Sequence, residues 1–177
     1  MRLFINGSTR KKNCDQIVND LISDIDEVLS LSEWTIKNCT GCHKCINKLE
    51  HDCVLKDDMT KVVYDKLKSA DQIVIVSPIY MSSIPGGLKT MLDRCFPFYH
   101  HDYFQGKQIF LVLVGQGTDE DNDEEIQDLI RYFTGISTWL HFQFFFLGYL
   151  SSGDCDDVKL FNSQYSKKVA GIREKLL

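Results

Sequence analysis

The sequence predicts an α/β fold, an open parallel sheet of five strands with helices on both faces. The main observation is that apolar runs of strand length alternate with segments of helical periodicity. Two of the runs, at residues 73–76 and 109–114, are continuously apolar, as in strands that are buried on both sides. Parallel neighbours need crossover connections, and the helical segments between the runs can supply them.

The strands are expected where apolar residues concentrate between polar turns. In chain order they are Arg2–Asn6, Glu33–Lys37, Gln72–Ser77, Gln108–Gly115 and Trp139–Leu147. The helices are expected where apolar residues recur at three- and four-residue spacing. They run from Ile17 to Ile25, from Met59 to Leu67, from Ile126 to Phe133, and from about Val158 to Leu176.

Length and composition predict a single domain over residues 1–177, with a cysteine-rich loop at 39–53. The net charge is −5, and outside an acidic stretch at residues 119–125 the charges nearly balance. We therefore expect no nucleic-acid partner, since such binding needs a basic surface. Without a signal peptide or a membrane-spanning apolar run, the sequence predicts a cytoplasmic protein with no membrane partner. The acidic stretch precedes a predicted helix, whose N-terminal dipole favours carboxylates.

The predicted ligand site lies beyond the carboxyl ends of the strands, as in other open α/β sheets. After the first strand comes a polar turn in which Ser8, Arg10 and backbone N–H groups could hold a phosphate. An ordinary strand-to-helix turn with solvated cations explains the same residues equally well. Neither G-x-G-x-x-G nor G-x-x-x-x-G-K-[ST] occurs, which disfavours a dinucleotide-binding Rossmann domain and a P-loop NTPase.

The loop after the third strand suits a flat, apolar ring system. Pro78 and Pro85 stiffen this loop, and Tyr80 and Met81 offer packing surfaces within it. Ordinary core or rim packing accounts for Tyr80 and Met81 as well, so the loop alone does not define a ligand.

Several short motifs follow one another in the order of a known family over about residues 1–150. They are Gly7-Ser8-Thr9-Arg10 through Asn13, Ala70-Asp71 through Ser77-Pro78-Ile79-Tyr80, Pro85-Gly86 through Leu88-Lys89, and Leu92-Asp93-Arg94. In this combination the chain resembles the NADPH-dependent FMN reductase family of flavodoxin-like proteins, close to its iron–sulfur flavoprotein branch. The resemblance implies a flavodoxin-like fold with strand order 2-1-3-4-5 and a bound FMN.

The resemblance also implies which residues bind the flavin. The phosphate would lie near Ser8, Arg10, Asn13 and Cys14. The isoalloxazine ring would lie near Pro78, Ile79, Tyr80, Met81 and Ser82, with Gly115, Gln116 and Gly117 on its other side. The family more often has Pro at the position of Thr9 and Ser or Thr at that of Cys14. Since a thiol is a poor donor, Cys14 weakens one expected hydrogen bond to the phosphate.

The implied activity is that of an FMN-dependent NAD(P)H oxidoreductase, of the flavin or quinone reductase type, which passes electrons to a small acceptor. No catalytic side chain is assigned, because the flavin itself carries the chemistry. The alternative is an iron–sulfur flavoprotein, in which a [4Fe-4S] cluster exchanges electrons with FMN and with a redox-protein partner. A binding module that kept the fold and lost the cofactor is a third hypothesis.

Four of the seven cysteines, Cys39, Cys42, Cys45 and Cys53, form the pattern C-x2-C-x2-C-x7-C. The spacing of the first three matches a ferredoxin-type cluster motif, whereas the spacing to the fourth does not. The segment resembles the compact motif of the iron–sulfur flavoproteins, and equally a cysteine-rich loop of relatives without a cluster. A [4Fe-4S] cluster, zinc and free or redox-active thiols therefore stay open as alternatives.

The aromatic segment Phe96–Phe104 is expected to be a packing or subunit-contact loop, because large aromatic side chains are enriched at interfaces. Together with the segment Cys39–Cys53 it predicts a homodimer or homotetramer. The remaining charged and metal-ligating residues are interpreted as structural or solvated. Asp93 and Arg94 are expected to form an ion pair, Cys95 and Cys155 to be isolated thiols, and His43 and His51 to be solvated.

Overall fold

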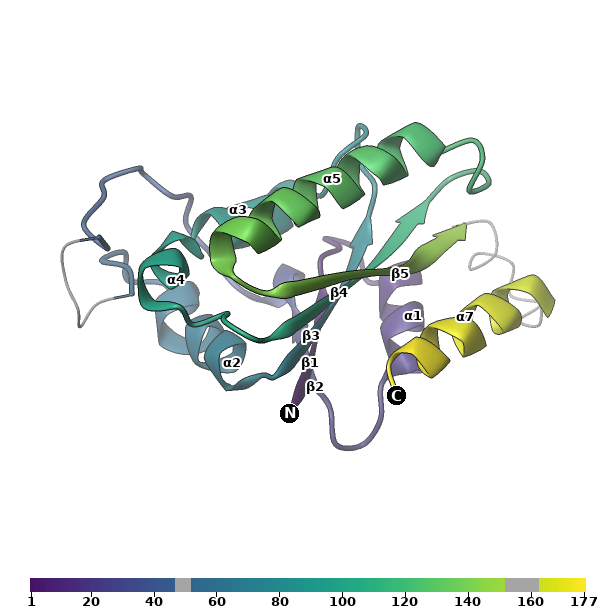
Figure 1. Cartoon of the computed structure of the whole chain (residues 1–177), viewed down its shortest axis with the longest axis horizontal. Coiled ribbons are helices and arrows are strands. Elements are labelled where there is room, and N and C mark those ends of the chain that lie inside the picture. Colours follow the sequence, from purple (N-terminus) through teal and green to yellow (C-terminus); the bar gives the residue numbers. More distant parts are fainter. Residues whose placement is uncertain (47–51, 152–162) are drawn as a thin grey trace.

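The protein is described by a computed structural model, which covers residues 1–46, 52–151 and 163–177. Five strands form one parallel sheet in the order β2-β1-β3-β4-β5 (Figure 1). They are β1 (Arg2–Asn6), β2 (Glu27–Ser30), β3 (Gln72–Pro78), β4 (Gln108–Gly115) and β5 (Gln143–Ser151). The predicted fold class and strand order are therefore confirmed.

Helices cover both faces of the sheet (Figure 1). One face carries two helices, α1 (Asn13–Leu21) and α7 (Ser163–Lys175). The other face carries α2 (Tyr64–Ser69), α3 (Gly86–Asp93), α4 (Phe96–His101) and α5 (Asp123–Leu140). Two short elements flank the cysteine-rich loop, the 3-10 helix η1 (Leu31–Glu33) and the π-helical turn η2 (Met59–Val63), which leads into α2.

The central strands are buried on both faces, as their continuous apolar runs predict. In β3, Ile73 and Ile75 pack into the core beneath α2, α3, α4 and α5. Val74 and Val76 pack into the opposite core, which includes residues of α1 and α7. Two apolar layers thus fix the sheet, and its carboxyl edge is held in place from both sides.

The second strand was predicted at Glu33–Lys37, which is wrong. The strand that pairs with β1 is Glu27–Ser30, with Phe4 opposite Val28. Residues 34–37 leave the sheet, because Trp34 and Ile36 pack on the core while the backbone N–H groups of this segment donate to side chains. Alternating apolar residues therefore mark a segment that packs on the core without strand partners.

Other boundaries also differ from the predictions. The fifth strand was expected at Trp139–Leu147, but α5 continues through Leu140 and ends at His141, which has φ +59°. The first helix stops at Leu21, and the aromatic segment expected to be a loop begins with the helix α4. The start of the predicted last helix, at 158–162, lies outside the described residues, as do Cys155 and His51. Within the described ranges, no helix combines the length and the apolar character needed to cross a membrane.

Candidate functional site

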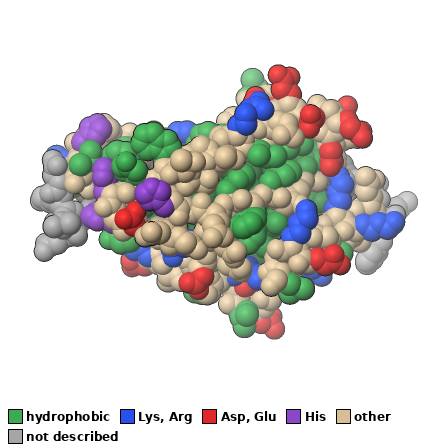
Figure 2. All heavy atoms as spheres, in the orientation of Figure 1, with side chains coloured by type: hydrophobic (Ala, Val, Ile, Leu, Met, Phe, Trp, Pro, Cys, Tyr) green, Lys and Arg blue, Asp and Glu red, His purple; other side chains and the backbone are tan. Residues whose placement is uncertain are grey.

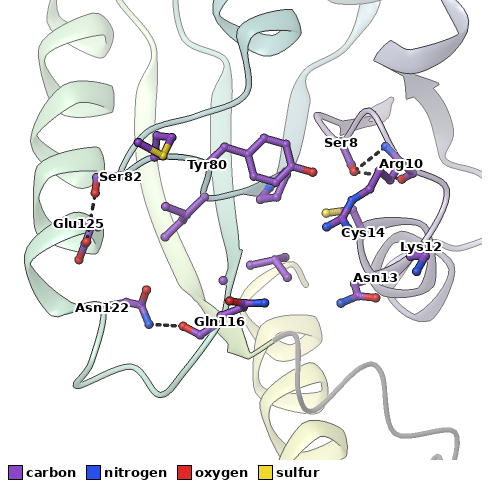
Figure 3. Close-up of a pocket in the computed structure, with 15 residues that line it drawn as sticks. Ser8, Arg10, Lys12, Asn13, Cys14, Tyr80, Ser82, Gln116, Asn122 and Glu125 are labelled. Carbon is purple, nitrogen blue, oxygen red and sulfur yellow. Dashed lines mark hydrogen bonds between the residues drawn. The ribbon is translucent and has the colours of Figure 1, made fainter.

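The carboxyl ends of β1, β3 and β4 surround a cleft of about 540 Å³ (Figure 3). This volume lies within the range of small-molecule and cofactor sites. All of the residues predicted to contact FMN line the cleft, with the exception of Gly117. The structure therefore brings together three loops that are far apart in the sequence, as expected for the carboxyl edge of an open α/β sheet.

The turn after β1 is fixed by a buried asparagine. Asn6 is 2% exposed; its Oδ1 accepts from the Ser8 backbone N–H at 2.9 Å and its Nδ2 donates to Asp15 Oδ1 at 2.5 Å. The Ser8 hydroxyl donates to the Arg10 carbonyl at 3.0 Å and accepts from the Arg10 backbone N–H at 3.1 Å (Figure 3). These bonds set the path of the chain into α1 before any ligand is present.

This end of the cleft has the features of an anion site. The N-terminus of α1 has no side-chain cap, so the partial positive charge of the helix end faces the turn. Arg10 and Lys12 line the cleft here, and the Arg10 guanidinium makes no ion pair with any described residue. The neighbouring Lys11 is instead paired with Glu33 at 2.9 Å and lies outside the lining.

A tight turn after β3 presents the aromatic wall of the cleft. Tyr80 and Ser83 exchange both backbone hydrogen bonds, at 2.7 and 3.0 Å. Between them Met81 and Ser82 have φ of +49° and +56°, a left-handed conformation that is costly for residues other than glycine. The Tyr80 ring points across the cleft toward Arg10, whose guanidinium carbon lies 6.0 Å from the ring centroid (Figure 3). Met81 is 98% exposed at the mouth of the cleft.

Tyr149 of β5 holds the loop after β4 in place through its hydroxyl group. The Tyr149 hydroxyl lies 3.1 Å from the Gln116 carbonyl and 3.2 Å from the Gly117 carbonyl, which can share its hydrogen. A Cβ atom at position 115 would lie only 2.7 Å from the Tyr149 hydroxyl oxygen, so a side chain there would force Tyr149 or the loop to shift. Gly117 turns toward Asp121 and away from the cleft, with φ +83°, which explains why it does not line the cavity.

Lys12, Val114, Asn122 and Glu125 line the cleft although the sequence did not point to them. Asn122 Nδ2 donates to the Gln116 carbonyl at 2.6 Å, and Glu125 accepts from the Ser82 hydroxyl at 3.2 Å (Figure 3). Both residues belong to the start of α5, where the acidic stretch was expected and is found. The sequence could have pointed to these two residues, because the start of a helix that follows β4 lies at the same edge of the sheet as the cleft.

The four clustered cysteines line a second cavity, of about 40 Å³, together with Arg94 and Phe96. Over residues 1–46, 52–151 and 163–177, however, no three His, Cys, Asp or Glu side chains are grouped so as to hold a metal ion. The pKa of Cys45 is raised, first by burial and then by the nearby Cys53, Cys42 and Cys39 thiols. The pKa of Cys42 is lowered by hydrogen bonds from the Lys44 backbone and the Thr40 side chain. The four thiols thus share one cavity without forming a metal-binding group among the described residues.

The remaining thiol of this region behaves as predicted for a structural cysteine. Cys95 is 1% exposed and its Sγ donates to the Met91 carbonyl at 3.3 Å. Burial raises the pKa of the Cys95 thiol to about 12, so it stays protonated at neutral pH.

The ion pair predicted between Asp93 and Arg94 is wrong. Asp93 pairs with Lys89 on the exposed side of α3, at 2.5 Å. The side chain of Arg94 turns into the protein and forms a bidentate pair with Asp57, at 2.7 and 3.2 Å. Burial alone would raise the pKa of Asp57, but hydrogen bonds from Arg94 and from the Lys37 backbone hold it below its ordinary value.

The helix α4 lies at the same end of the molecule as the cysteine cavity, where Figure 2 shows hydrophobic and histidine side chains together. Phe98 is buried in the core, whereas Phe96 and Tyr99 are each 37% exposed. Tyr99 also contacts the exposed Trp139 of α5, with ring centroids 5.6 Å apart.

Comparison with curated proteins finds relatives that are named iron–sulfur flavoproteins. One from Archaeoglobus fulgidus is 32% identical over 121 residues, which span 65% of this chain and 58% of the relative. One from Methanocaldococcus jannaschii is 37% identical over 102 residues, spanning 54% of this chain and 50% of the relative. The matched region is therefore little more than half the length of these relatives.

Solved structures of low identity share the fold. The Trp repressor binding protein from Bacillus subtilis superposes with a TM-score of 0.68 at 16% identity, over 100% of this chain and 98% of the other. An FMN-dependent NADH-azoreductase from Bacillus anthracis in complex with FMN gives 0.61 at 17% identity, over 99% and 98%. The model of the NADPH-dependent FMN reductase family matches residues 2–138. Since that match covers most of the chain, the protein belongs to the NADPH-dependent FMN reductase family of flavodoxin-like flavin oxidoreductases.

Proposed function

We propose that this chain is an FMN-dependent oxidoreductase that takes electrons from NAD(P)H and passes them to a small acceptor such as a quinone or free flavin. The observation that carries the proposal is the polarity of the cleft. One end has an uncapped helix N-terminus with Arg10, and the other has Tyr80 and the loop at Gly115. FMN has an anionic phosphate at one end and a flat ring at the other, so its two parts match the two ends of the cleft.

In this proposal the turn after β1 binds the phosphate, through Ser8, Arg10, Asn13 and Cys14. Pro78, Ile79, Tyr80, Met81 and Ser82 contact one side of the ring. The loop of Gly115, Gln116 and Gly117 lies on its other side, where Gly115 and Gln116 line the cleft and Gly117 shapes the turn behind them. When bound, FMN supplies the capacity to accept a hydride from a nicotinamide and to release the electrons afterwards. The protein binds and orients the ring, and the nicotinamide and then the acceptor would reach it through the mouth of the cleft beside the exposed Met81.

The test is reconstitution of the purified protein with FMN, followed by anaerobic mixing with NADH or NADPH. We expect one FMN per chain, bleaching of the flavin absorption by at least one nicotinamide, and recovery of the absorption when a quinone is added. A protein that does not bind FMN would overturn the proposal. A flavoprotein that neither nicotinamide reduces would overturn the assignment of the electron donor.

We propose as a second function that Cys39, Cys42, Cys45 and Cys53 bind one [4Fe-4S] cluster, which exchanges electrons with FMN and a redox-protein partner. The supporting observation is that all four thiols line one cavity, although no three of them form a metal-binding group in the part of the chain that the structure describes. The donor set fits, because four thiolates are the usual ligands of such a cluster. The names of the relatives point the same way for those proteins.

The cluster is tested by iron and sulfide analysis of protein purified without oxygen from iron-replete cells. Replacing any one of the four cysteines by serine should lower the iron content and leave FMN bound, because the cleft is built from other loops. Cys95→Ala is the matched control, since this thiol does not line the cavity, and it should retain the iron. Wild-type protein that carries FMN but well under one iron per chain would refute this second function.

We also propose that the protein assembles as a homodimer or homotetramer, through the segment Phe96–Phe104 and the cysteine loop. Phe96, Tyr99 and Trp139 expose aromatic surface beside the cysteine cavity, which supports a contact there. Sedimentation at micromolar concentration should show more than one chain, and Tyr99→Lys should shift the distribution toward the monomer. A wild-type monomer under these conditions would contradict the proposal.

A further inference from the structure

The cysteine loop, residues 38–56, is described at residues 38–46 and 52–56. Residues 35–37 before the loop lie beside residues 57–58 after it, and we call this place the neck of the loop. On the outgoing side, the backbone N–H of Lys37 donates to Asp57 Oδ2 at 2.9 Å, and that of Thr35 donates to Asp58 Oδ2 at 2.8 Å. Asp57 and Asp58 stand on the returning side, directly after the loop. The two ends of the loop are therefore tied to each other by backbone-to-carboxylate hydrogen bonds.

One buried guanidinium lies between these two ends. The Arg94 side chain has 0% exposure and that of Asp57 has 2%. Arg94 Nη1 donates to the Lys37 carbonyl at 2.7 Å and to Asp57 Oδ2 at 2.7 Å, while Nη2 donates to Asp57 Oδ1 at 3.2 Å. A single side chain from the end of α3 thus contacts both the outgoing and the returning segment.

The same side chain lines the cavity of the four cysteines. Arg94 Nε is buried and has no hydrogen-bond partner among the described residues, which is unusual because a buried N–H group without a partner is costly. A guanidinium keeps its positive charge at any physiological pH, and charges are screened weakly in a buried environment. The cavity is therefore bordered by the permanently charged Arg94 guanidinium, whose Nε–H donates to no described residue.

We propose that Arg94 is a positioning residue of the cysteine site, which holds the two ends of the loop together and sets the charge beside the group that the thiols bind. The inference rests on the second proposed function, the [4Fe-4S] cluster. Reduction adds one negative charge to such a cluster, and nearby charge and hydrogen bonds tune its potential. A buried cation favours the reduced form, so Arg94 raises the reduction potential, and Asp57 limits the rise.

The charge role is tested by two substitutions that act in opposite directions. Arg94→Gln removes the cation and should shift the midpoint potential of the anaerobic holoprotein to more negative values. Asp57→Asn leaves the cation without its counter-charge and should shift the potential to more positive values. Lys89→Gln, at an exposed pair on α3, is the matched control and should not shift it. Unchanged potentials in both variants, or shifts of the same sign, would overturn the charge role.

The positioning role is tested on metal-free protein, so that it does not depend on the cluster. Cys45 and Cys53 are half-buried, and Arg94→Gln should increase their rate of alkylation by iodoacetamide severalfold, as followed by mass spectrometry. Arg94→Lys keeps the charge but loses the bidentate geometry. It should therefore increase alkylation while keeping the potential near that of the wild type, and it serves as the second variant if Arg94→Gln does not fold. Unchanged alkylation in the folded variant would overturn the positioning role, whereas iron-free wild-type protein would refute the cluster alone.

Discussion

The cleft at the carboxyl edge of the sheet and the cysteine loop are held in the fold in different ways. The cleft is built where β1, β3 and β4 end, and each of these strands is paired on both sides. The cysteine loop follows η1 and precedes η2 in the chain, its described residues belong to no strand of the sheet, and its neck depends on the buried pair of Arg94 and Asp57. The cleft should therefore tolerate the loss of single polar contacts, whereas the loop should not.

The largest expected effect on stability comes from removing the Asp57 carboxylate at the neck of the cysteine loop. Asp57→Ala leaves the Arg94 charge buried without its partner, so the free energy of unfolding should fall by about 3–5 kcal/mol. Asp93→Ala removes a carboxylate of the exposed pair with Lys89 on α3, where the loss should stay within about 0.5 kcal/mol. Urea unfolding of the two variants measures both values. Equal losses would show that the neck does not depend on the buried pair.

The same pair predicts a pH dependence with a definite sign. The pKa of Asp57 is lowered in the folded protein, so its contribution is fully present above the unfolded pKa of about 4 and is lost as the pH falls through the folded value. The difference in unfolding free energy between wild type and Asp57→Asn should therefore be largest near neutral pH and shrink in acid. A difference that is independent of pH would contradict the charged pair.

A second substitution tests how firmly the cleft is held by its sheet. Gly115→Ala places a Cβ atom 2.7 Å from the Tyr149 hydroxyl oxygen, and we expect a loss of about 1–3 kcal/mol in unfolding free energy. FMN affinity should fall as well, because the loop that carries Gln116 must move. Gly135→Ala on α5 meets no atom within 4 Å and should be neutral or stabilising by about 0.5–1 kcal/mol. Calorimetric titration with FMN and urea unfolding of both variants provide the comparison.

The two regions also differ in how far the sequence predicts them. The buried strands and the residues that follow them are predictable, because continuous apolar runs mark β3 and β4 and a parallel sheet brings their ends to one edge. The second strand was misplaced since β2 is a short edge strand in which only Leu29 is buried. The more regular alternation at Trp34 and Ile36 belongs to a segment without strand partners.

At the sites, the sequence could not show contacts between distant residues. Nothing in Leu92-Asp93-Arg94 indicates that Arg94 turns inward to Asp57, which is 37 residues away in the chain. Asn122 and Glu125 read as solvated residues of an acidic stretch, because only the packing of α5 against the sheet shows that they border the cleft. The periodicity of apolar residues predicts the helices and strands. Contacts between side chains that are distant in the sequence depend on how these elements pack together.

A fourth test compares two neighbouring cations at the anion end of the cleft, Arg10 and Lys11. Arg10→Ala should weaken FMN binding about tenfold, or roughly 1.4 kcal/mol, through loss of a charge-assisted hydrogen bond to the phosphate. Unfolding of the FMN-free protein should not change, because Arg10 makes no ion pair with a described residue. Lys11→Ala is the matched control, since Lys11 pairs with Glu33 outside the cleft, and FMN affinity should stay constant. Equal affinities of both variants and the wild type would remove Arg10 from the site.

The smallest expected effect concerns Cys14, which is 3% exposed and lines the cleft from α1. A hydroxyl donates a stronger hydrogen bond than a thiol, so Cys14→Ser should tighten FMN binding two- to fivefold, about 0.5–1 kcal/mol. Cys95→Ser buries a hydroxyl away from the cleft and should lose stability without any change in FMN affinity. Tighter FMN binding by Cys14→Ser, with no change for Cys95→Ser, would locate the phosphate beside α1. A weaker or unchanged FMN affinity of Cys14→Ser would place the phosphate elsewhere in the cleft.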